Sequence, residues 1–276
     1  MLHAFKYAAP RSRAEMLDLL AEHGERAKVL AGGTDLLVNI RGGNMKPALV
    51  IDAKRVEGYG GLSWDPAEGL TLRPATTIND VLRDKRVRTD FPLLAICGHD
   101  LASYQIRNRA TVIGNVVNAS PCSDMAPALL CFGALAEISS ARGTRTVPFT
   151  EFFTGVKKTV LAKDEILERI VIPASAAGTK GEYRKLKRIN GHDLGIVGVA
   201  IARKGGSLRI AVSSAAPVPV LVTGLSAGST VDEAVAATLA AVNPISDVRC
   251  TKEYRLFMIE TFVRRLMEEM KWPRSV

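Results

Sequence analysis

Short apolar runs alternate with a helical repeat over the first 54 residues, and this pattern predicts a small α/β unit. Ser12 precedes apolar positions at Met16, Leu19 and Leu20, which is the spacing of an amphipathic helix with a serine cap. A glycine pair then follows a short apolar run and indicates a tight turn. The expected order is a strand at 5–8, a helix after residue 12, a strand at 29–31, the glycine turn, a helix to about residue 41 and a strand at 47–52.

Residues 55–173 show a different pattern, in which two hairpins frame a run of short helices. A turn at 64–69 separates the apolar runs 61–63 and 70–73, and a second hairpin joins 135–140 to 144–148. Between and after them we expect helices opening at 77–80, at 92–103 and at 124–132, an extended, glycine-interrupted segment at 110–118, and a closing strand at 166–172.

Small residues at 174–180 mark a boundary, after which the pattern changes again. A hairpin pairs 197–203 with 208–213, and residues 217–222 are extended. A capped, alanine-rich helix runs from about 229 to 241. The final helix, 251–270, carries an apolar stripe that indicates a core or an interface: Leu256, Ile259, Val263, Leu266 and Met270.

Together these elements predict an α+β protein with two domains. The first domain covers residues 1–173 and divides into subdomains at about 1–54 and 55–173. The second covers residues 174–276 and contains a three-stranded sheet and helices. With 276 residues and 47% hydrophobic content, the chain can bury cores of this size.

Composition narrows the classes of function. Aromatic residues make up only 5% of the chain, which argues against stacking platforms for single-stranded nucleic acid. The net charge is +9, and its densest basic runs, at 83–88 and 184–188, match no nucleic-acid-binding motif. We therefore expect a solvated basic surface, an anionic ligand or an acidic partner subunit, and no nucleic acid.

The cysteines point to no metal site within this chain. Cys97, Cys122, Cys131 and Cys250 form no C-x-x-C pair, and the histidines are scattered. The first residues lack a secretory apolar region, and no run of about 18 apolar residues occurs. We expect a cytoplasmic protein with free thiols and no membrane span. Four common signatures are also absent: the G-x-G-x-x-G dinucleotide loop, the P-loop, H-E-x-x-H and G-x-S-x-G.

The first candidate site is the glycine turn at 30–35. Glycine accepts positive φ and lets a ligand or another backbone come close. A Thr-Asp pair can then cap the following helix, whose free N–H groups would suit an anion. The residues concerned are Leu30, Ala31, Gly32, Gly33, Thr34 and Asp35.

The second candidate site, at 111–124, joins a glycine turn to small polar side chains that suit sugar hydroxyls and phosphate oxygens. Asp124 could equally serve as the cap of the next helix. The candidate ligand residues here are Thr111, Val112, Gly114, Asn115, Ser120, Ser123 and Asp124.

The third candidate site is a basic segment that contains Tyr183, Lys185, Arg188 and Asp193. One interpretation is a solvated basic edge strand, whose charges discourage edge-to-edge pairing. The other is that Lys185 faces a bound anionic group while Asp193 hydrogen-bonds a polar one.

Together the three segments resemble the FAD-binding medium subunit of the molybdenum hydroxylases, over nearly the whole chain. That family includes the medium chain of aerobic carbon monoxide dehydrogenase and the FAD domain of xanthine dehydrogenase. Its motifs A-G-G-[TH]-[DS]-L-L, T-[IVL]-G-G-N with S-P-x-S-D, and Y-x-K-x-x-R with a downstream aspartate match residues 31–37, 111–115 with 120–124, and 183–193. Residues 247–249 and 254–255 resemble the family's closing domain.

The resemblance implies a two-subdomain FAD-binding fold of the PCMH type. It implies that the two glycine loops hold the FAD pyrophosphate, that Asp124 lies near the ribityl hydroxyls, and that Lys185 and Asp193 lie at the flavin end. It further implies a large molybdopterin-binding subunit and a small [2Fe–2S] subunit as partners, and a dimer of heterotrimers. Electrons would pass from the [2Fe–2S] clusters through FAD to an acceptor such as NAD, with no catalytic residue in this chain.

One position departs from the family pattern. Ile113 stands where the second motif has its first glycine, and a branched side chain disfavours positive φ. We therefore expect an extended backbone at residue 113, with more of the pyrophosphate contact at Gly32 and Gly33.

Two other classes of function remain open at this point. A stand-alone flavin oxidoreductase of the same fold would need its own general acid or base, for which His192 is the only candidate near the motifs. A nucleic-acid or anion-binding module is suggested only by the positive net charge.

Overall fold

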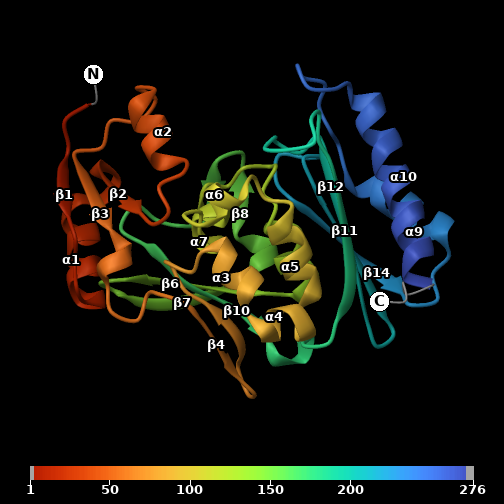
Figure 1. Ribbon diagram of the computed structural model, residues 1–276, viewed down its shortest axis with the longest axis horizontal. Coiled ribbons are helices and arrows are strands. Elements are labelled where there is room, and N and C mark those ends of the chain that lie inside the picture. The colour runs from red at the N-terminus through yellow and green to blue at the C-terminus, as the bar shows by residue number, and fades with distance from the viewer. Residues whose placement is uncertain (1–2, 272–276) are drawn as a thin grey trace.

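The computed structural model describes residues 3–271, so Met1, Leu2 and the last residues of the second predicted domain lie outside the described part. Three sheets of three or more strands follow one another along the longest axis of the molecule, in the order in which the chain forms them (Figure 1). Among residues 3–271, no helix combines the length and apolar character needed to cross a membrane.

The first sheet is parallel, with strand order β1-β3-β2. The hydroxyl of Ser12 accepts a hydrogen bond from the Glu15 amide and caps α1, which buries Met16, Leu17 and Leu20. The elements are β1 (Lys6–Ala8), α1 (Arg13–His23), η1 (Gly24–Arg26), β2 (Ala27–Leu30), α2 (Leu36–Arg41), β3 (Leu49–Asp52) and η2 (Ala53–Arg55). The predicted α/β unit is present.

The second sheet has five antiparallel strands in the order β4-β5-β10-β6-β7, and short helices lie beside it. Its strands are β4 (Leu62–Asp65), β5 (Gly69–Leu72), β6 (Leu135–Ser140), β7 (Gly143–Pro148) and β10 (Ile166–Pro173), and β8 (Phe153–Gly155) pairs separately with β9 (Lys158–Thr159). The helices are α3 (Ile78–Arg83), α4 (Lys85–Asp90), α5 (Pro92–His99), α6 (Tyr104–Arg107), α7 (Val112–Val117), α8 (Ala126–Phe132) and η3 (Phe149–Glu151).

The third sheet is antiparallel in the order β11-β12-β13-β14, and α9 and α10 pack beside it. Ile259, Val263 and Leu266 of α10 are fully buried, so the predicted stripe belongs to the core. The elements are η4 (Ala174–Ala176), β11 (Lys180–Leu186), β12 (Val197–Lys204), β13 (Ser207–Ser213), β14 (Val220–Ser226), α9 (Val231–Ala241) and α10 (Lys252–Lys271).

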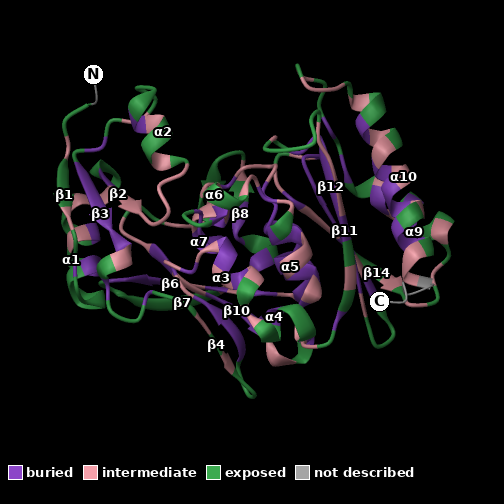
Figure 2. Ribbon diagram, viewed as in Figure 1, coloured by how far each residue is buried: buried purple, intermediate pink, exposed green. Residues whose placement is uncertain are grey.

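The second and third sheets share a core. Tyr183, Ala200, Ala202 and Ala211 belong to the same buried cluster as the apolar residues of α5 and α8. β12 is buried over most of its length, whereas the residues of β11 other than Tyr183 are intermediate or exposed (Figure 2). Alanine on the neighbouring strands β12 and β13 allows the helices to approach closely.

The structure confirms the α+β class and corrects several predicted elements. The third sheet has four strands instead of three, because residues 180–186 pair with β12. Residues 112–117 form helix α7 instead of an extended segment. Three boundaries also move: α5 ends at His99, α8 begins at Ala126, and β14 begins at Val220.

Candidate functional site

Gly32 brings the first candidate loop into backbone contact with the second subdomain. A Cβ at this position would lie 2.1 Å from the carbonyl oxygen of Arg109 and 2.9 Å from Cα of Ala110. Any side chain would therefore push apart two backbones that lead into the two candidate loops. Gly33, with a φ of +77°, makes the turn that follows.

The first loop presents unused hydrogen-bond donors. In the part of the chain that the structure describes, no group accepts a hydrogen bond from the backbone N–H groups of Gly32, Gly33, Thr34 or Asp35. Asp35 occupies the N-cap position of α2 without capping it, and Thr34 makes no capping bond either, so the predicted caps are wrong. Asp35 Oδ1 instead accepts a hydrogen bond from Asn118 Nδ2 at 3.2 Å, a second link between the loops.

Lys54 hydrogen-bonds to the first loop, a contact that the sequence analysis did not predict. Its Nζ donates to the carbonyl oxygen of Ala31 at 3.0 Å and pairs with the buried Asp52 carboxylate. Tyr7 donates to the same carboxylate at 2.8 Å. The sequence signal that could have indicated this contact was a lysine two residues after an aspartate at the end of an apolar strand.

The second loop is helical at Ile113, which contradicts the expected extended backbone. Thr111 Oγ1 accepts from the Gly114 amide at 2.9 Å and caps α7. Val112, Ile113 and Val116 are buried, at positions that share one side of a helical turn. The residue at 113 is therefore a core residue in right-handed conformation, for which a branched side chain is acceptable.

The polar side chains of the second loop mostly hold the loop itself. Asn115 Oδ1 accepts from Ser123 Oγ at 2.6 Å and from the Met125 amide at 3.3 Å. Ser123 Oγ accepts a hydrogen bond from the Ala126 amide in the first turn of α8. In the described chain Asp124 makes no such bond, so its predicted capping role is wrong. Ser120 Oγ accepts from the Cys122 amide.

Asp124 and Lys185 form a buried ion pair between the second loop and β11. Lys185 Nζ lies 2.8 Å from Asp124 Oδ1 and donates to the carbonyl oxygen of Asp100 at 3.3 Å. The Lys185 side chain is only 2% exposed, which rules out the solvated-edge interpretation for this residue although β11 is an edge strand.

Burial dominates the electrostatics of this pair. It raises the pKa of Asp124, while the ammonium of Lys185 opposes the rise. Tyr183 donates to the same carboxylate at 3.4 Å, and burial raises the pKa of its phenol well above the usual range.

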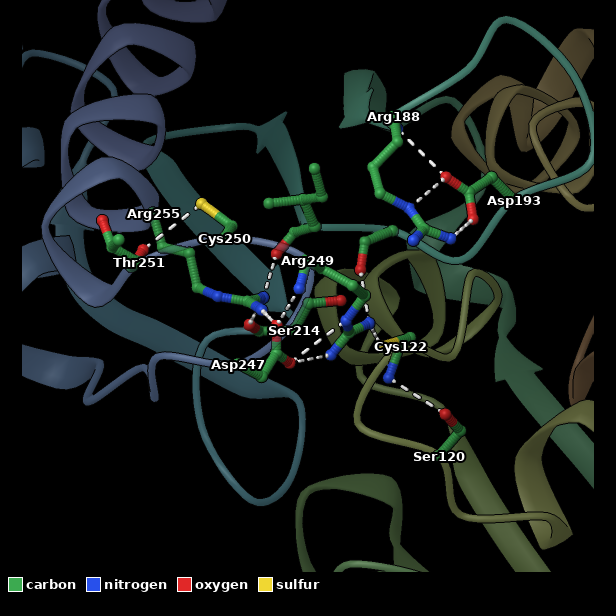
Figure 3. A network of polar contacts seen from close by, with 12 residues as sticks. Ser120, Cys122, Arg188, Asp193, Ser214, Asp247, Arg249, Cys250, Thr251 and Arg255 are labelled. Atoms are coloured by element: carbon green, nitrogen blue, oxygen red, sulfur yellow. Dashed lines mark hydrogen bonds and ion pairs between the residues drawn. The ribbon is translucent and has the colours of Figure 1, made fainter.

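Asp193 is engaged elsewhere. Arg188 contacts its carboxylate in bidentate fashion, with Nη2 at 2.9 Å from Oδ1 and Nε at 3.1 Å from Oδ2 (Figure 3). This hydrogen bonding holds the pKa of Asp193 well below its usual range. Lys185 and Asp193 thus have different partners, and no hydrogen bond or ion pair joins the two in the described chain.

A polar network ties the second loop to the C-terminal elements, through the segment that resembled the family's closing domain (Figure 3). Asp247 pairs with Arg249 at 2.7 Å and with the fully buried Arg255 at 2.8 Å. Arg249 Nη1 in turn reaches Cys122 Sγ and the carbonyl oxygen of Gly195, each at 3.2 Å. The spacing of these charges was visible in the sequence, but their contact with the loop was not.

Two family models together match most of the chain. Residues 3–175 match the FAD binding domain in molybdopterin dehydrogenase, and residues 181–270 match the CO dehydrogenase flavoprotein C-terminal domain. The sequence is 31% identical to the carbon monoxide dehydrogenase medium chain of Hydrogenophaga pseudoflava, over 98% of both chains. It is 30% identical to the xanthine dehydrogenase FAD-binding subunit of Escherichia coli O157:H7, over 95% of this chain and 94% of the relative.

The fold agrees with a solved relative. The carbon monoxide dehydrogenase from Hydrogenophaga pseudoflava, in a form lacking the molybdenum-pyranopterin moiety, contains a chain that superposes with a TM-score of 0.89 at 30% identity, covering 97% of each chain. The chain therefore belongs to the family of FAD-binding medium subunits of the molybdenum hydroxylases, with FAD as its cofactor.

Proposed function

We propose that the two loops and the Lys185 segment form the FAD site of this subunit. The proposed contact residues are Leu30, Ala31, Gly32, Gly33, Thr34 and Asp35 from the first loop, Thr111, Val112, Gly114, Asn115, Ser120, Ser123 and Asp124 from the second, and Lys185 and Asp193. They come from the first subdomain, the second subdomain and the C-terminal part of the described chain. The observation that carries the proposal is the set of unused backbone donors at Gly32–Asp35 beside the second loop.

The residues present fit a dinucleotide with an anionic centre. Unpaired backbone N–H groups are suitable donors for phosphate oxygens. In the second loop, by contrast, the amides of Val112, Gly114 and Asn115 already donate to Thr76 or Thr111. The first loop therefore carries more of the pyrophosphate contact, for a reason different from the one inferred from Ile113.

Lys185 supplies positive charge to the flavin end of the site. Flavin can accept electrons one at a time and release them as a pair, and a reduced ring carries negative charge. The ammonium of Lys185 is held by Asp124 and Asp100 instead of being free to move. A fixed cation needs little reorganisation when negative charge develops nearby.

The subunit then acts as the electron-transfer component of a larger enzyme, through which electrons leave the complex. We propose that it receives electrons from the [2Fe–2S] clusters of a small partner, beside a large molybdopterin-binding subunit, and passes them to an acceptor such as NAD. The relatives' names, medium chain and FAD-binding subunit, support such an assembly, which we propose to be a dimer of heterotrimers. Among residues 3–271, no group of three or more His, Cys, Asp or Glu side chains is placed to hold a metal ion.

The proposed site also depends on both predicted domains. Residues 1–173 provide the two loops, and residues 174–276 provide Lys185 and Asp193. We propose this division as the functional one, in which the second domain closes the flavin end of a site built by the first.

A glycine substitution tests the loop assignment. Gly32→Ala places a Cβ against the Arg109 carbonyl, so we expect it to separate the loops and abolish FAD binding. The matched control is Gly60→Ala, because a Cβ there meets nothing within 4 Å. FAD titration of the apo chains measures affinity, and circular dichroism checks folding. A folded Gly32→Ala chain with normal FAD affinity would refute the proposed site.

A further inference from the structure

Ser214 combines two unfavourable features in one residue. Its backbone φ is +64°, in the left-handed region that a serine rarely adopts. The residue is 8% exposed, and its hydroxyl finds no hydrogen-bond partner among residues 3–271. A buried, unpaired hydroxyl and a strained backbone each call for an explanation, and both are typical of functional positions.

The backbone of Ser214 is held from two directions. Its amide donates to the carbonyl oxygen of Pro121 in the second loop at 2.8 Å. Its carbonyl oxygen accepts from Nη1 of the buried Arg255 at 3.1 Å, and Asp247 pairs with the same guanidinium (Figure 3). The second loop and α10 together therefore maintain the left-handed conformation and fix the direction of the side chain.

The free hydroxyl lies beside Lys185. A Cβ built on the buried Gly195 would lie 3.4 Å from Ser214 Oγ and 3.3 Å from Cε of Lys185. The serine hydroxyl and the Lys185 side chain thus both lie next to Gly195, a residue without a side chain. Lys185 itself is fixed by Asp124 of the second loop.

Other residues with a left-handed backbone lie in or near segments that contact the second loop or Lys185. The remaining non-glycine residues with positive φ in the described chain are Ala102, Ala119 and Lys157. Ala119 belongs to the second loop and accepts the Lys157 amide at 2.8 Å, and Ala102 follows Asp100, whose carbonyl holds Lys185. Three of the four non-glycine residues with positive φ in the described chain thus lie in the second loop or bond to it through their amide or carbonyl group.

We propose that Ser214 is a further FAD-contacting residue, whose hydroxyl donates a hydrogen bond to an acceptor atom of the bound cofactor. This inference rests on the proposed FAD site and adds a residue to it. The cofactor supplies the partner that the hydroxyl lacks within the chain, and the position beside Lys185 assigns the contact to the end of the cofactor that the lysine faces.

Two substitutions of Ser214 separate the hydroxyl from the strain. Ser214→Ala removes only the hydroxyl, whereas Ser214→Gly removes the hydroxyl and relieves the backbone. We expect Ser214→Ala to weaken FAD binding about tenfold, as for one lost hydrogen bond, and to shift the visible absorption of the bound flavin. The thermal midpoint of the apo protein should stay level or rise, because an unsatisfied buried group is gone. Ser207→Ala, at an exposed strand position, is the matched control and should change neither.

The outcomes distinguish the inference from the proposed function. Wild-type protein that fails to bind FAD would refute the proposed function itself. Normal FAD affinity and an unshifted spectrum in Ser214→Ala, with wild-type binding intact, would overturn the role of Ser214 alone. A loss of affinity in Ser214→Ala that Ser214→Gly fully restores would also overturn it, because strain and not the hydroxyl would then govern binding.

Discussion

Lys185 and Asp124 are the residues at which charge and burial compete most directly. Both side chains are withdrawn from solvent, and a buried pair of this kind gains its stability only when both charges are present. Asp100 adds a carbonyl to the lysine, and Tyr183 adds a hydroxyl to the carboxylate. The attraction between the two side chains thus offsets part of the cost of burying them.

Removing the lysine tests this balance. We expect Lys185→Met to raise the pKa of Asp124 further, because burial remains while the opposing cation is lost. A raised pKa means that the folded state retains the proton, so the stability of the variant should fall as pH rises above the unfolded value of 3.8. Leaving one member of a buried pair costs about 3–5 kcal/mol. Carboxyl NMR and urea unfolding across pH measure both effects.

The same variant bears on the flavin. In Lys185→Met the reduction potential of the bound flavin should fall, by roughly 30 mV for each 1.4 kcal/mol by which the two-electron-reduced flavin loses stabilisation. In Asp124→Asn the reduction potential of the flavin should rise. Lys204→Met serves as the control. Lys204 lies at the end of β12, and Lys185 pairs with Gly198 near the start of that strand. An unchanged potential in Lys185→Met would leave the lysine with a purely structural role.

At the scale of elements, short helices decide the shape of the site. Helix α7 has only six residues, which is less than two turns, and its apolar residues alone do not distinguish it from a strand. The Thr111 hydroxyl and the burial of Ile113 against the central core favour the helix. Its C-terminal end carries Asn118, which reaches Asp35 of the first loop.

Loss of the Thr111 cap should therefore affect both stability and binding. We expect Thr111→Val to destabilise the protein by about 1 kcal/mol, the usual value of an N-cap, and to weaken FAD binding because Gly114–Asn118 shift. Thr230→Val removes the equivalent cap of α9, away from the loops, and should lower stability alone. Urea unfolding and FAD titration separate the two results. Equal FAD affinity in both variants would show that α7 does not shape the site.

The elements that were predicted correctly are those whose signals are local. The α1 cap at Ser12, the capping box of α9 and the long stripe of α10 are each contained within one segment. The failures lie where distant contacts decide. Val112, Ile113 and Val116 suit a strand as well as a helix, and residues 180–186 become a strand only because β12 pairs with them. The site residues at 30–35 and 111–124 remain predictions. The contacts of Lys54, Ser214 and Arg249 depend on the tertiary fold and were not accessible from the sequence.

At the scale of the whole molecule, the Asp247 network connects the C-terminal helix to the second loop. Asp247 binds two arginines, of which Arg249 reaches Cys122 and Arg255 holds Ser214. Hydrogen bonds from Arg249 keep the pKa of Asp247 well below its usual range. A carboxylate with a lowered pKa contributes stability above its unfolded pKa, and that contribution disappears as pH falls towards the folded value.

This gives the molecule a defined acid response. We expect Asp247→Asn to be clearly less stable than wild type at neutral pH, and the difference to shrink below about pH 4 as the wild-type contribution is lost. Asp232→Asn breaks an exposed pair with Arg264 and should change stability little at any pH. Urea unfolding at several pH values provides the measurement. A stability difference independent of pH would exclude Asp247 as the titrating group.

The contact at Gly32 has a consequence for how the sequence can vary. The first loop touches the carbonyl oxygen of Arg109, while the Arg109 side chain is exposed. A carbonyl is common to all residues, so a change of the exposed side chain at position 109 leaves the contact unaltered as long as the amide can still donate to Ile106, whereas position 32 cannot accept even a methyl group. The contact between the two loops thus constrains the side chain at position 32 but not the side chain at position 109. We expect substitutions to be tolerated far better at position 109 than at position 32.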